Sequence, residues 1–351
     1  MHSRVVFTPD DTDWRLPVVG PGLLLDVPNE GPWNRRPFLH VEVAPRYRLR
    51  VSSGGQPLLW VRIDDWWNGC GLLRGPAHAP QVLPPLTASE VRDVAHEPRS
   101  PRWWEDWAWH VGRALERSSR PVLHAGRWCL RPLQAVGPRE AAPYACIPSG
   151  LSGNPPAPPH SLEAVRRFET LWMEDWHSSL SPDELKVDSG AVLPLRAPSS
   201  EEEGRVKSWR KRARDGTLPP ALLLYLEIVG KWLVLDGHDR LHAALLEGVA
   251  PPLLGLWPVF EEAIPVEPVR REGILISVEV QTRQKGTPAV IDRANRALVR
   301  EFTEHRRVAI TRAWPLRGGA GAWRAEVLAW RRWCPFPANA EAWAWFLSSK
   351  D

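Results

Sequence analysis

The ionisable side chains whose types and spacing best suit chemistry lie in one segment, from Asp236 to Arg240, with His242 two residues later. An imidazole can exchange a proton near neutral pH, and a guanidinium can bind a phosphate through two parallel hydrogen bonds. Carboxylates can accept a proton or contact a metal ion. Phosphoryl transfer needs little more than such groups, because it depends on positioning and electrostatics. We therefore take this segment as the candidate site.

A buried strand and an amphipathic helix are expected to position these side chains. The run from Trp232 to Leu235 is apolar without alternation, which predicts a strand covered on both faces. Gly237 can adopt a positive φ, and Asp236 or Gly237 can cap a helix over residues 238–247. Its first turn would present free backbone N–H groups beside Arg240, an arrangement that favours a bound phosphate.

The residues from Leu235 to Ala244 resemble the strand-to-helix turn of the ParB/sulfiredoxin-like superfamily, which often carries Asp-Gly-His-His-Arg or a close variant there. The upstream order is similar too: a basic helix, Asp215-Gly216, Leu218-Pro219-Pro220, an apolar strand and a Gly230-Lys231 turn. The resemblance covers about residues 199–257. It implies an α/β core that binds the phosphates of a nucleotide, with CTP, ATP or ADP as the cofactor and Mg²⁺ as a further ligand.

The resemblance also implies roles for individual residues. Arg240 would hold phosphate, within a cofactor-binding group of Asp236, Gly237, Arg240 and His242. His238, Asp239 and Glu203 would be the catalytic residues, as proton acceptors or metal contacts. The reductase branch of the superfamily has a cysteine before its His-Arg pair, and this chain has Gly237 there, which argues against a reductase.

Asp239 stands where many members of the superfamily have His or Arg. Its negative charge beside a triphosphate requires a metal ion or Arg240 to offset it. His238 and His242 are four residues apart and share a helical face, which permits a metal contact or two solvent-exposed side chains. We predict no metal site built from protein ligands alone.

Composition indicates an ordinary globular protein. The 351 residues suggest two or three domains, with 43% hydrophobic and 25% charged residues. A net charge of +4 is too small to require a nucleic-acid partner. The four cysteines have no CxxC spacing, which argues against a disulfide framework and a zinc site. With no signal peptide or spanning apolar run, we expect a cytoplasmic protein without a membrane partner.

The expected fold class is α+β, divided by a Pro/Gly linker at residues 148–160. Residues 1–147 are expected to form a Trp-rich, β-dominated domain with strands near 23–27, 38–43, 47–52 and 58–63 and a helix over 102–117. Residues 161–265 would hold the ParB/sulfiredoxin-like domain. Residues 266–351 would form an α+β part with a strand over 273–281, a helix over 288–304 and a hairpin of 308–314 with 323–330.

Two further features leave alternatives open. The 21 tryptophans permit two interpretations. They could bind a ligand or partner, by stacking on bases or sugars or by docking a protein on the N-terminal domain, or they could fill cores. The basic helix from Arg205 to Arg214 either binds nucleic-acid phosphate or is a solvated face partly neutralised by the acids at 201–203.

Three functional hypotheses follow. The first is a nucleotide- or phosphate-binding protein, acting as an NTP-dependent phosphotransferase, a kinase or an NTPase. The second is a DNA-binding protein or nuclease that uses the basic helix. The third is a non-catalytic interaction protein in which the motif is a structural turn, with Asp236 as a cap and Arg240 paired to an acid.

Overall fold

The computed structural model places a defined part of the chain. The described residues are 2–5, 22–27, 39–63, 70–75, 82–118, 122–135, 158, 172–173, 176, 185–187, 191–259, 268–284, 290–291, 294–295, 298, 313–332 and 340–348. They contain helices together with parallel and antiparallel strands, so the predicted α+β class is confirmed. The chain divides into two compact units, one of Met1–Val259 with Ile310–Asp351 and one of Phe260–Ala309.

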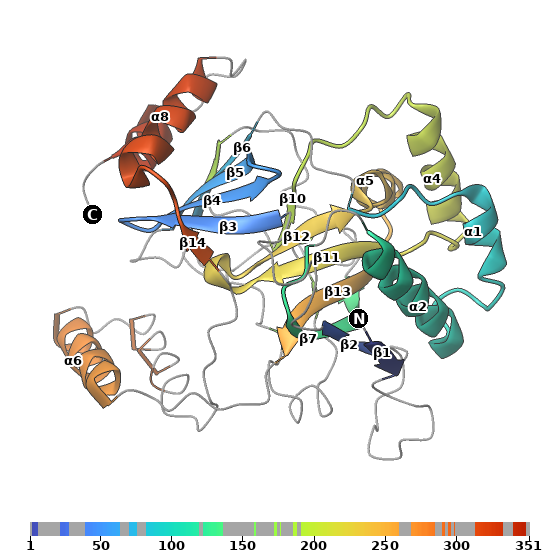
Figure 1. Ribbon diagram of the computed structural model, residues 1–351, viewed down its shortest axis with the longest axis horizontal. Coiled ribbons are helices and arrows are strands. Elements are labelled where there is room, and N and C mark those ends of the chain that lie inside the picture. The colour runs from blue at the N-terminus through green and yellow to red at the C-terminus, as the bar shows by residue number, and fades with distance from the viewer. Residues whose placement is uncertain are drawn as a thin grey trace. The chain divides into compact units, whose positions relative to one another are not determined.

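The larger unit holds two sheets (Figure 1). Sheet A has the strand order β1-β2-β7-β13-β11-β12-β10, and β8 pairs with β7 outside this path. Its strands are β1 (His2–Val5), β2 (Leu23–Val27), β7 (Gly126–Ala135), β8 (Trp172–Met173), β10 (Val192–Pro194), β11 (Ala221–Leu226), β12 (Lys231–Asp236) and β13 (Pro252–Val259). Strands β10 and β12 are parallel, as are β11 and β13, whereas β11 and β12 are antiparallel.

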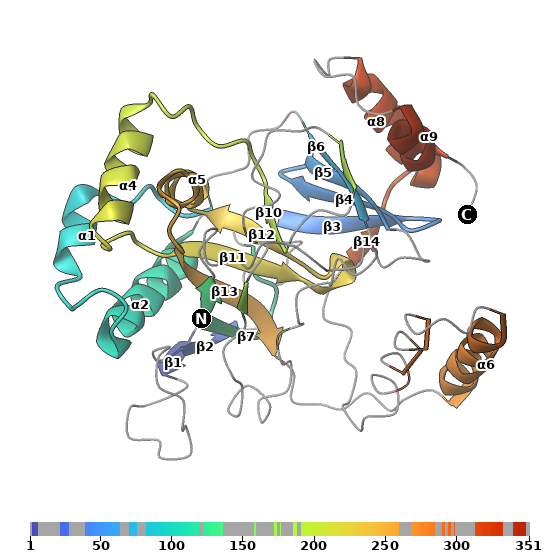
Figure 2. The same ribbon diagram turned by 180° about the vertical axis from the view of Figure 1, so that it is seen from behind.

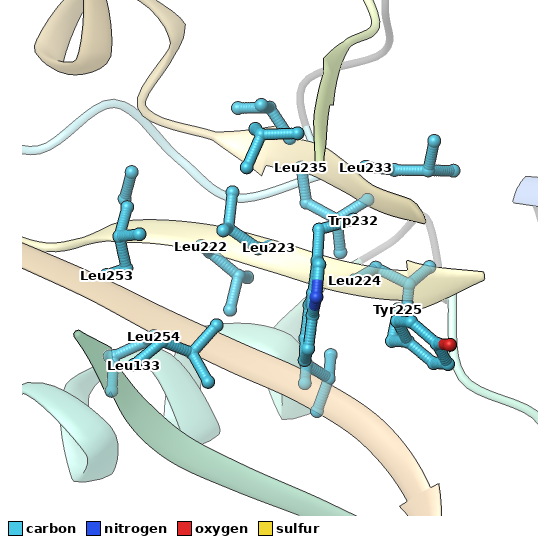
Figure 3. Packing of buried hydrophobic residues seen from close by; sticks show 14 of the residues in the cluster. Leu133, Leu222, Leu223, Leu224, Tyr225, Trp232, Leu233, Leu235, Leu253 and Leu254 are labelled. Atoms are coloured by element: carbon cyan, nitrogen blue, oxygen red, sulfur yellow. The ribbon is translucent and has the colours of Figure 1, made fainter. Parts of the chain in front are cut away.

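The centre of sheet A is apolar because both of its faces are covered. Every residue of β11 and β13 is buried, and β12 is buried from Lys231 to Leu235. Trp232 reaches from β12 toward Tyr225 and the neighbouring strands (Figure 3). A Cβ on Gly255 would lie 2.8 Å from Leu133 and 2.8 Å from Trp232, so glycine at this position makes room for the indole.

Four helices gather near one end of sheet A (Figures 1 and 2). They are α1 (Ala88–Asp93), α2 (Pro101–Arg117), α4 (Gly204–Arg214) and α5 (His238–Glu247). Helix α2 begins after Ser100, whose side chain accepts a hydrogen bond from the N–H of Trp103. It contacts β2 and β7 and buries Trp103, Trp104 and Trp107. The strands expected near residues 23–63 and the helix over 102–117 are confirmed.

Sheet B has the order β14-β3-β4-β5-β6-β9. Its strands are β3 (Leu39–Ala44), β4 (Arg48–Ser53), β5 (Gln56–Ile63), β6 (Cys70–Arg74), β9 (Leu185–Val187) and β14 (Ala313–Pro315). The C-terminal helices α8 (Gly319–Arg331) and α9 (Ala340–Leu347) pack on it through a second apolar cluster that includes Trp60, Trp323 and Phe346.

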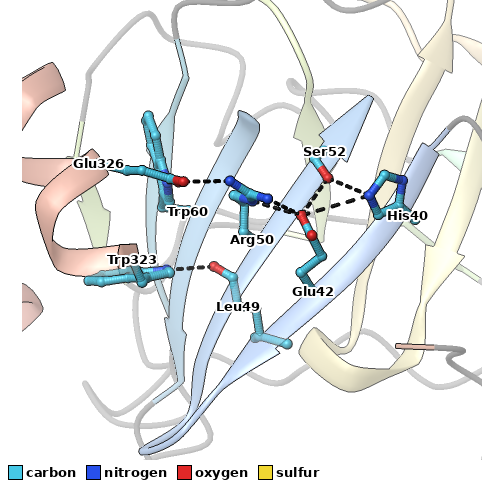
Figure 4. A network of polar contacts seen from close by, with 8 residues as sticks. All are labelled: His40, Glu42, Leu49, Arg50, Ser52, Trp60, Trp323 and Glu326. Atoms are coloured by element: carbon cyan, nitrogen blue, oxygen red, sulfur yellow. Dashed lines mark hydrogen bonds and ion pairs between the residues drawn. The ribbon is translucent and has the colours of Figure 1, made fainter. Parts of the chain in front are cut away.

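Polar contacts fix α8 on sheet B (Figure 4). Glu326 accepts hydrogen bonds from Arg50 at 2.5 Å and from the indole of Trp60 at 3.0 Å. Arg50 also pairs with the buried Glu42 at 2.6 Å, and Trp323 donates to the carbonyl of Leu49 at 2.8 Å. Trp60 and Trp323 therefore fill a core and anchor a helix. This agrees with the interpretation that the tryptophans fill cores. Partner binding by tryptophan stays a prediction.

The compact units differ from the domains expected from the sequence. Strand β7, from the expected N-terminal domain, pairs with β13 over the whole of β13, and β6 pairs with β9. The parts before and after the Pro/Gly segment thus share both sheets. Except for Pro158, the segment 148–160 itself lies outside the described residues. The Pro/Gly composition of this segment predicted a linker between domains. Strand pairing between distant segments instead determines which parts of the chain belong to one compact unit.

Two secondary-structure predictions in the C-terminal part are wrong. Residues 273–281 lie inside helix α6 (Pro268–Gln284), and residues 323–330 lie inside α8. In α8 the buried Trp323 and Val327 are four residues apart, which is helical spacing, and Gly318 begins the helix with φ 82°. In α6 the β-branched residues were misleading, because Ile276 and Val280 are exposed and do not pack in a sheet.

Residues 290–291, 294–295 and 298 are helical, and the rest of the expected helix 288–304 lies outside the described residues. In the described part of the chain, no helix is both long and apolar enough to span a bilayer.

The shared sheet predicts the behaviour of a cleaved chain. If a specific protease site is inserted within residues 148–160 and cut, the two fragments should stay together, because β7 and β13 remain hydrogen-bonded from Arg127 to Gln134. Gel filtration in native buffer should give one peak containing both fragments, and in urea two peaks. Two separate, folded fragments in native buffer would show that each side forms its own domain.

Candidate functional site

The candidate site lies where β12 ends and α5 begins. The strand, turn and helix predicted from the sequence are present, with Asp236 last in β12 and α5 starting at His238. Gly237 is the N-cap with φ 97°, and no side chain caps the helix. A Cβ at this position would lie 2.7 Å from Cβ of Ala221 and 2.8 Å from Nη2 of Arg240. Glycine is therefore required both by its backbone conformation and by the close approach of Arg240.

The parallel neighbour β10 brings a second loop to the site. Its register pairs Val192 with Trp232 and Pro194 with Val234, so the chain leaves β10 beside the end of β12. The N–H of Leu195 donates a 3.1 Å hydrogen bond to Nε2 of His238. This imidazole nitrogen is thus an acceptor, and the other nitrogen carries the proton.

The chemistry of His238 follows from its burial. Desolvation, with the nearby Arg196 adding to it, lowers the pKa of His238 to about 3, so the ring is neutral at pH 7. Its lone pair is already used by the Leu195 N–H. His238 therefore links α5 to the end of β10, and the geometry does not suit the predicted role of proton acceptor.

Asp239 is held by the segment that follows β10. Its carboxylate accepts hydrogen bonds from Arg196 at 2.9 Å and from the N–H of Ser199 at 3.0 Å, and Arg205 lies at 3.9 Å. Burial alone would raise the pKa of Asp239, but the bonds from Arg196 and Ser199 outweigh it and hold the pKa below its usual value. The negative charge of Asp239 is thus balanced by Arg196.

Arg240 is 2% exposed and forms an ion pair with Asp236 through Nη2. Its guanidinium also lies 5.8 Å from the ring centroid of Trp209 on α4, which is within cation–π range. Its Nε is buried and has no hydrogen-bond partner among the described residues. A buried guanidinium N–H without an acceptor is costly. A ligand would reach this donor only after a local shift of the Arg240 side chain.

These side chains surround a cavity of about 240 Å³. Its lining residues are Val82, Leu83, Arg196, Arg205, Trp209, Leu235, Asp236, Gly237, His238, Asp239 and Arg240. Most of the polar lining is charged, and three guanidinium groups come from three different segments. The arrangement can bind an anion at the N-terminus of α5.

The structure brings together most of the predicted site residues, but not all of them. Asp236, Gly237, His238, Asp239 and Arg240 all line the cavity. The expected second acid, Glu203, is exposed at the N-cap of α4 and does not line it. His242 does not line it either, although its Nδ1 is buried without a partner among the described residues.

Sequence reasoning did not assign three polar or aromatic lining residues to the site: Arg196, Trp209 and Arg205, which was named only as part of the basic helix. A signal for Arg196 was present, because it directly follows the short apolar segment 191–195 and parallel strands place their carboxyl ends at one sheet edge. Trp209 occupies a buried position on the basic helix, four residues after Arg205.

The basic helix α4 is largely paired with acids. Arg210 and Arg214 both contact Glu247, at 2.5 and 2.8 Å, and Lys207 contacts Glu202 at 2.7 Å. These pairs agree with the solvated-face interpretation, and nucleic-acid binding by this helix stays a prediction. Among the described residues, no cluster of three or more His, Cys, Asp or Glu could hold a metal ion.

Comparisons with protein-family models, with curated proteins and with solved structures found no match to this chain. The resemblance to the ParB/sulfiredoxin-like superfamily therefore stays a prediction from the motif.

The low pKa of His238 predicts a pH-dependent stability. The unfolded histidine has a pKa near 6.5 and the folded one about 3, so the stabilising contribution is complete above about pH 6.5 and is lost as pH falls toward the folded pKa. His238→Gln keeps an acceptor for the Leu195 N–H and removes the titration. Between pH 7 and pH 5 the wild type should lose about 2 kcal/mol more unfolding free energy than this variant, measured by urea denaturation. Equal losses in the two proteins would contradict the assignment.

Proposed function

We propose that this protein binds a phosphate-bearing small molecule, a nucleotide or a phosphorylated metabolite, in the cavity at the β12–α5 junction. The observation that carries the proposal is the convergence of Arg196, Arg205 and Arg240 on one cavity at a helix N-terminus. Guanidinium groups suit phosphate because their N–H donors match its oxygens in pairs. The positive end of the α5 dipole adds to the same attraction.

The interaction-protein hypothesis accounts for part of this geometry. It expected Arg240 to pair with an acid, and Arg240 does pair with Asp236. That pair, however, leaves the Nε of Arg240 without an acceptor among the described residues, beside a cavity large enough for several water molecules. With a small shift of the Arg240 side chain, a phosphate in the cavity would supply the acceptor, and this supports the binding proposal over a purely structural turn.

The reaction class, phosphotransfer or NTP hydrolysis, stays a prediction for the same cavity. His238 and Asp239 are engaged by Leu195 and Arg196, and Glu203 is exposed outside it. Asp236 is the lining carboxylate with the greater side-chain exposure, 21% against 4% for Asp239. Although Asp236 pairs with Arg240, it is therefore the more accessible of these two carboxylates to a ligand. Binding does not depend on the reaction class.

The proposal is tested with inorganic phosphate, pyrophosphate, CTP, ATP, ADP and GTP, each with and without Mg²⁺. A ligand that binds only the folded state raises the melting temperature by mass action, and calorimetry then gives its affinity. Arg240→Lys keeps a positive charge beside Asp236 but lacks the paired donors. It should weaken binding by about 2 kcal/mol, roughly thirtyfold.

Lys211→Ala is the matched control, because it removes a positive charge from the exposed side of α4 away from the cavity. Its affinity should equal that of the wild type. If no phosphate-bearing compound binds the wild type, and Arg240→Lys only melts earlier, then Arg240 is structural and the proposal fails.

A further inference from the structure

We infer that the ligand of this cavity is a compact phosphate monoester, such as a phosphorylated sugar or amino acid, and that Arg205 is the residue that selects its phosphate. The inference rests on the proposed function and narrows it, because it separates a small phosphorylated metabolite from a nucleoside triphosphate.

The first argument is size. The cavity measures about 240 Å³, whereas pockets for drug-sized ligands run from about 300 to 1,000 Å³. A phosphate group and a body of a few carbons fit such a space. A triphosphate with its ribose and base would extend beyond it. The cavity also has an enclosing wall, since Val82 and Leu83 from the segment before α1 line it together with residues of α4 and α5.

The second argument is charge. Three arginines and two aspartates are among the described residues that line the cavity, and the buried His238 is neutral, so these residues carry a formal charge of one positive unit. A phosphate monoester carries about −1.5 to −2 charges at pH 7 and leaves a small imbalance. A triphosphate would leave several uncompensated negative charges beside Asp236 and Asp239.

The third argument is the aromatic lining. Among the described residues that line the cavity, Trp209 is the one aromatic residue besides His238, and its ring lies 5.8 Å from the guanidinium of Arg240. It is 7% exposed. A nucleobase site commonly offers an aromatic face for stacking, and this ring is already covered by a cation on one side. The lining therefore favours a polar ligand body over a flat base.

Arg205 differs from the other two arginines in its contacts. Arg196 donates to Asp239 at 2.9 Å, and Arg240 pairs with Asp236. Arg205 lies 3.9 Å from Asp239, beyond hydrogen-bond distance, and its side chain is 48% exposed. Asp239 stays bonded to Arg196 and to Ser199 N–H if Arg205 turns to a ligand. Of the three guanidinium groups, Arg205 can thus form two new hydrogen bonds without breaking a short one.

Calorimetry on the full chain tests the ligand class. The probes are inorganic phosphate, ribose 5-phosphate, phosphoserine, CTP and ATP, with ribose and serine as unphosphorylated controls. We expect at least one of the two monoesters to bind tenfold or more tightly than CTP and ATP, and the unphosphorylated controls not to bind. Tighter binding of CTP or ATP would overturn the inference and leave the proposed function standing. Absence of binding by every phosphorylated probe would overturn both.

Variants of α4 test the assignment of Arg205. Arg205→Ala should weaken the best monoester at least tenfold, and Arg205→Lys should restore only part of the loss, because a single ammonium lacks the paired donors. Both variants should melt within a degree or two of the wild type, since the side chain is half exposed. Lys211→Ala on the same helix should bind as the wild type does. If Arg205→Ala binds the monoester as tightly as Lys211→Ala, the assignment is overturned.

Discussion

The parallel pairing of β10 with β12 is the constraint on which the candidate site depends. It places the segment after β10 beside the first turn of α5, where Leu195, Arg196 and Ser199 meet His238 and Asp239. Two segments about 40 residues apart in sequence are thereby joined by hydrogen bonds at one end of the sheet. Without that register, the Asp236–Arg240 segment would be an isolated turn with two acids and one arginine. The crevice at the carboxyl ends of neighbouring parallel strands is also where ligands bind in many α/β proteins.

Burial then determines which charges can coexist at this edge. Asp239 and Arg240 are 4% and 2% exposed, so each needs a partner of opposite charge. Arg196 and Asp236 supply these partners. Removing one member of such a buried pair typically costs about 3–5 kcal/mol, because the remaining charge is left uncompensated. The two pairs therefore contribute to local order even without a ligand, and they leave Arg205 as the arginine whose contacts can change at low cost.

The sequence predicted the local parts of this arrangement well. The apolar run before Asp236, the positive φ of Gly237 and the helix to Glu247 follow from residue types within a few positions. The compact units could not be found in the same way, because they depend on pairings such as β7 with β13, whose members are more than a hundred residues apart. The strand predicted over 273–281 failed for another reason. Its β-branched residues favoured a strand, but propensity is a weak guide when the side chains are exposed in a helix.

The same difference between local and long-range information explains which site residues could be predicted from the sequence. Asp236 to Arg240 could be found because one turn of chain holds them together. Arg196 could be found only by knowing that β10 lies beside β12, and Trp209 only by knowing that α4 packs on α5. Two of the predicted catalytic groups, His238 and Asp239, proved to be the contacts that hold this assembly together. In a motif rich in ionisable residues, the side chains that appear most reactive can instead be those that position the backbone. In the site proposed above, the guanidinium whose contacts leave it available to a ligand lies on a neighbouring element, Arg205 on α4.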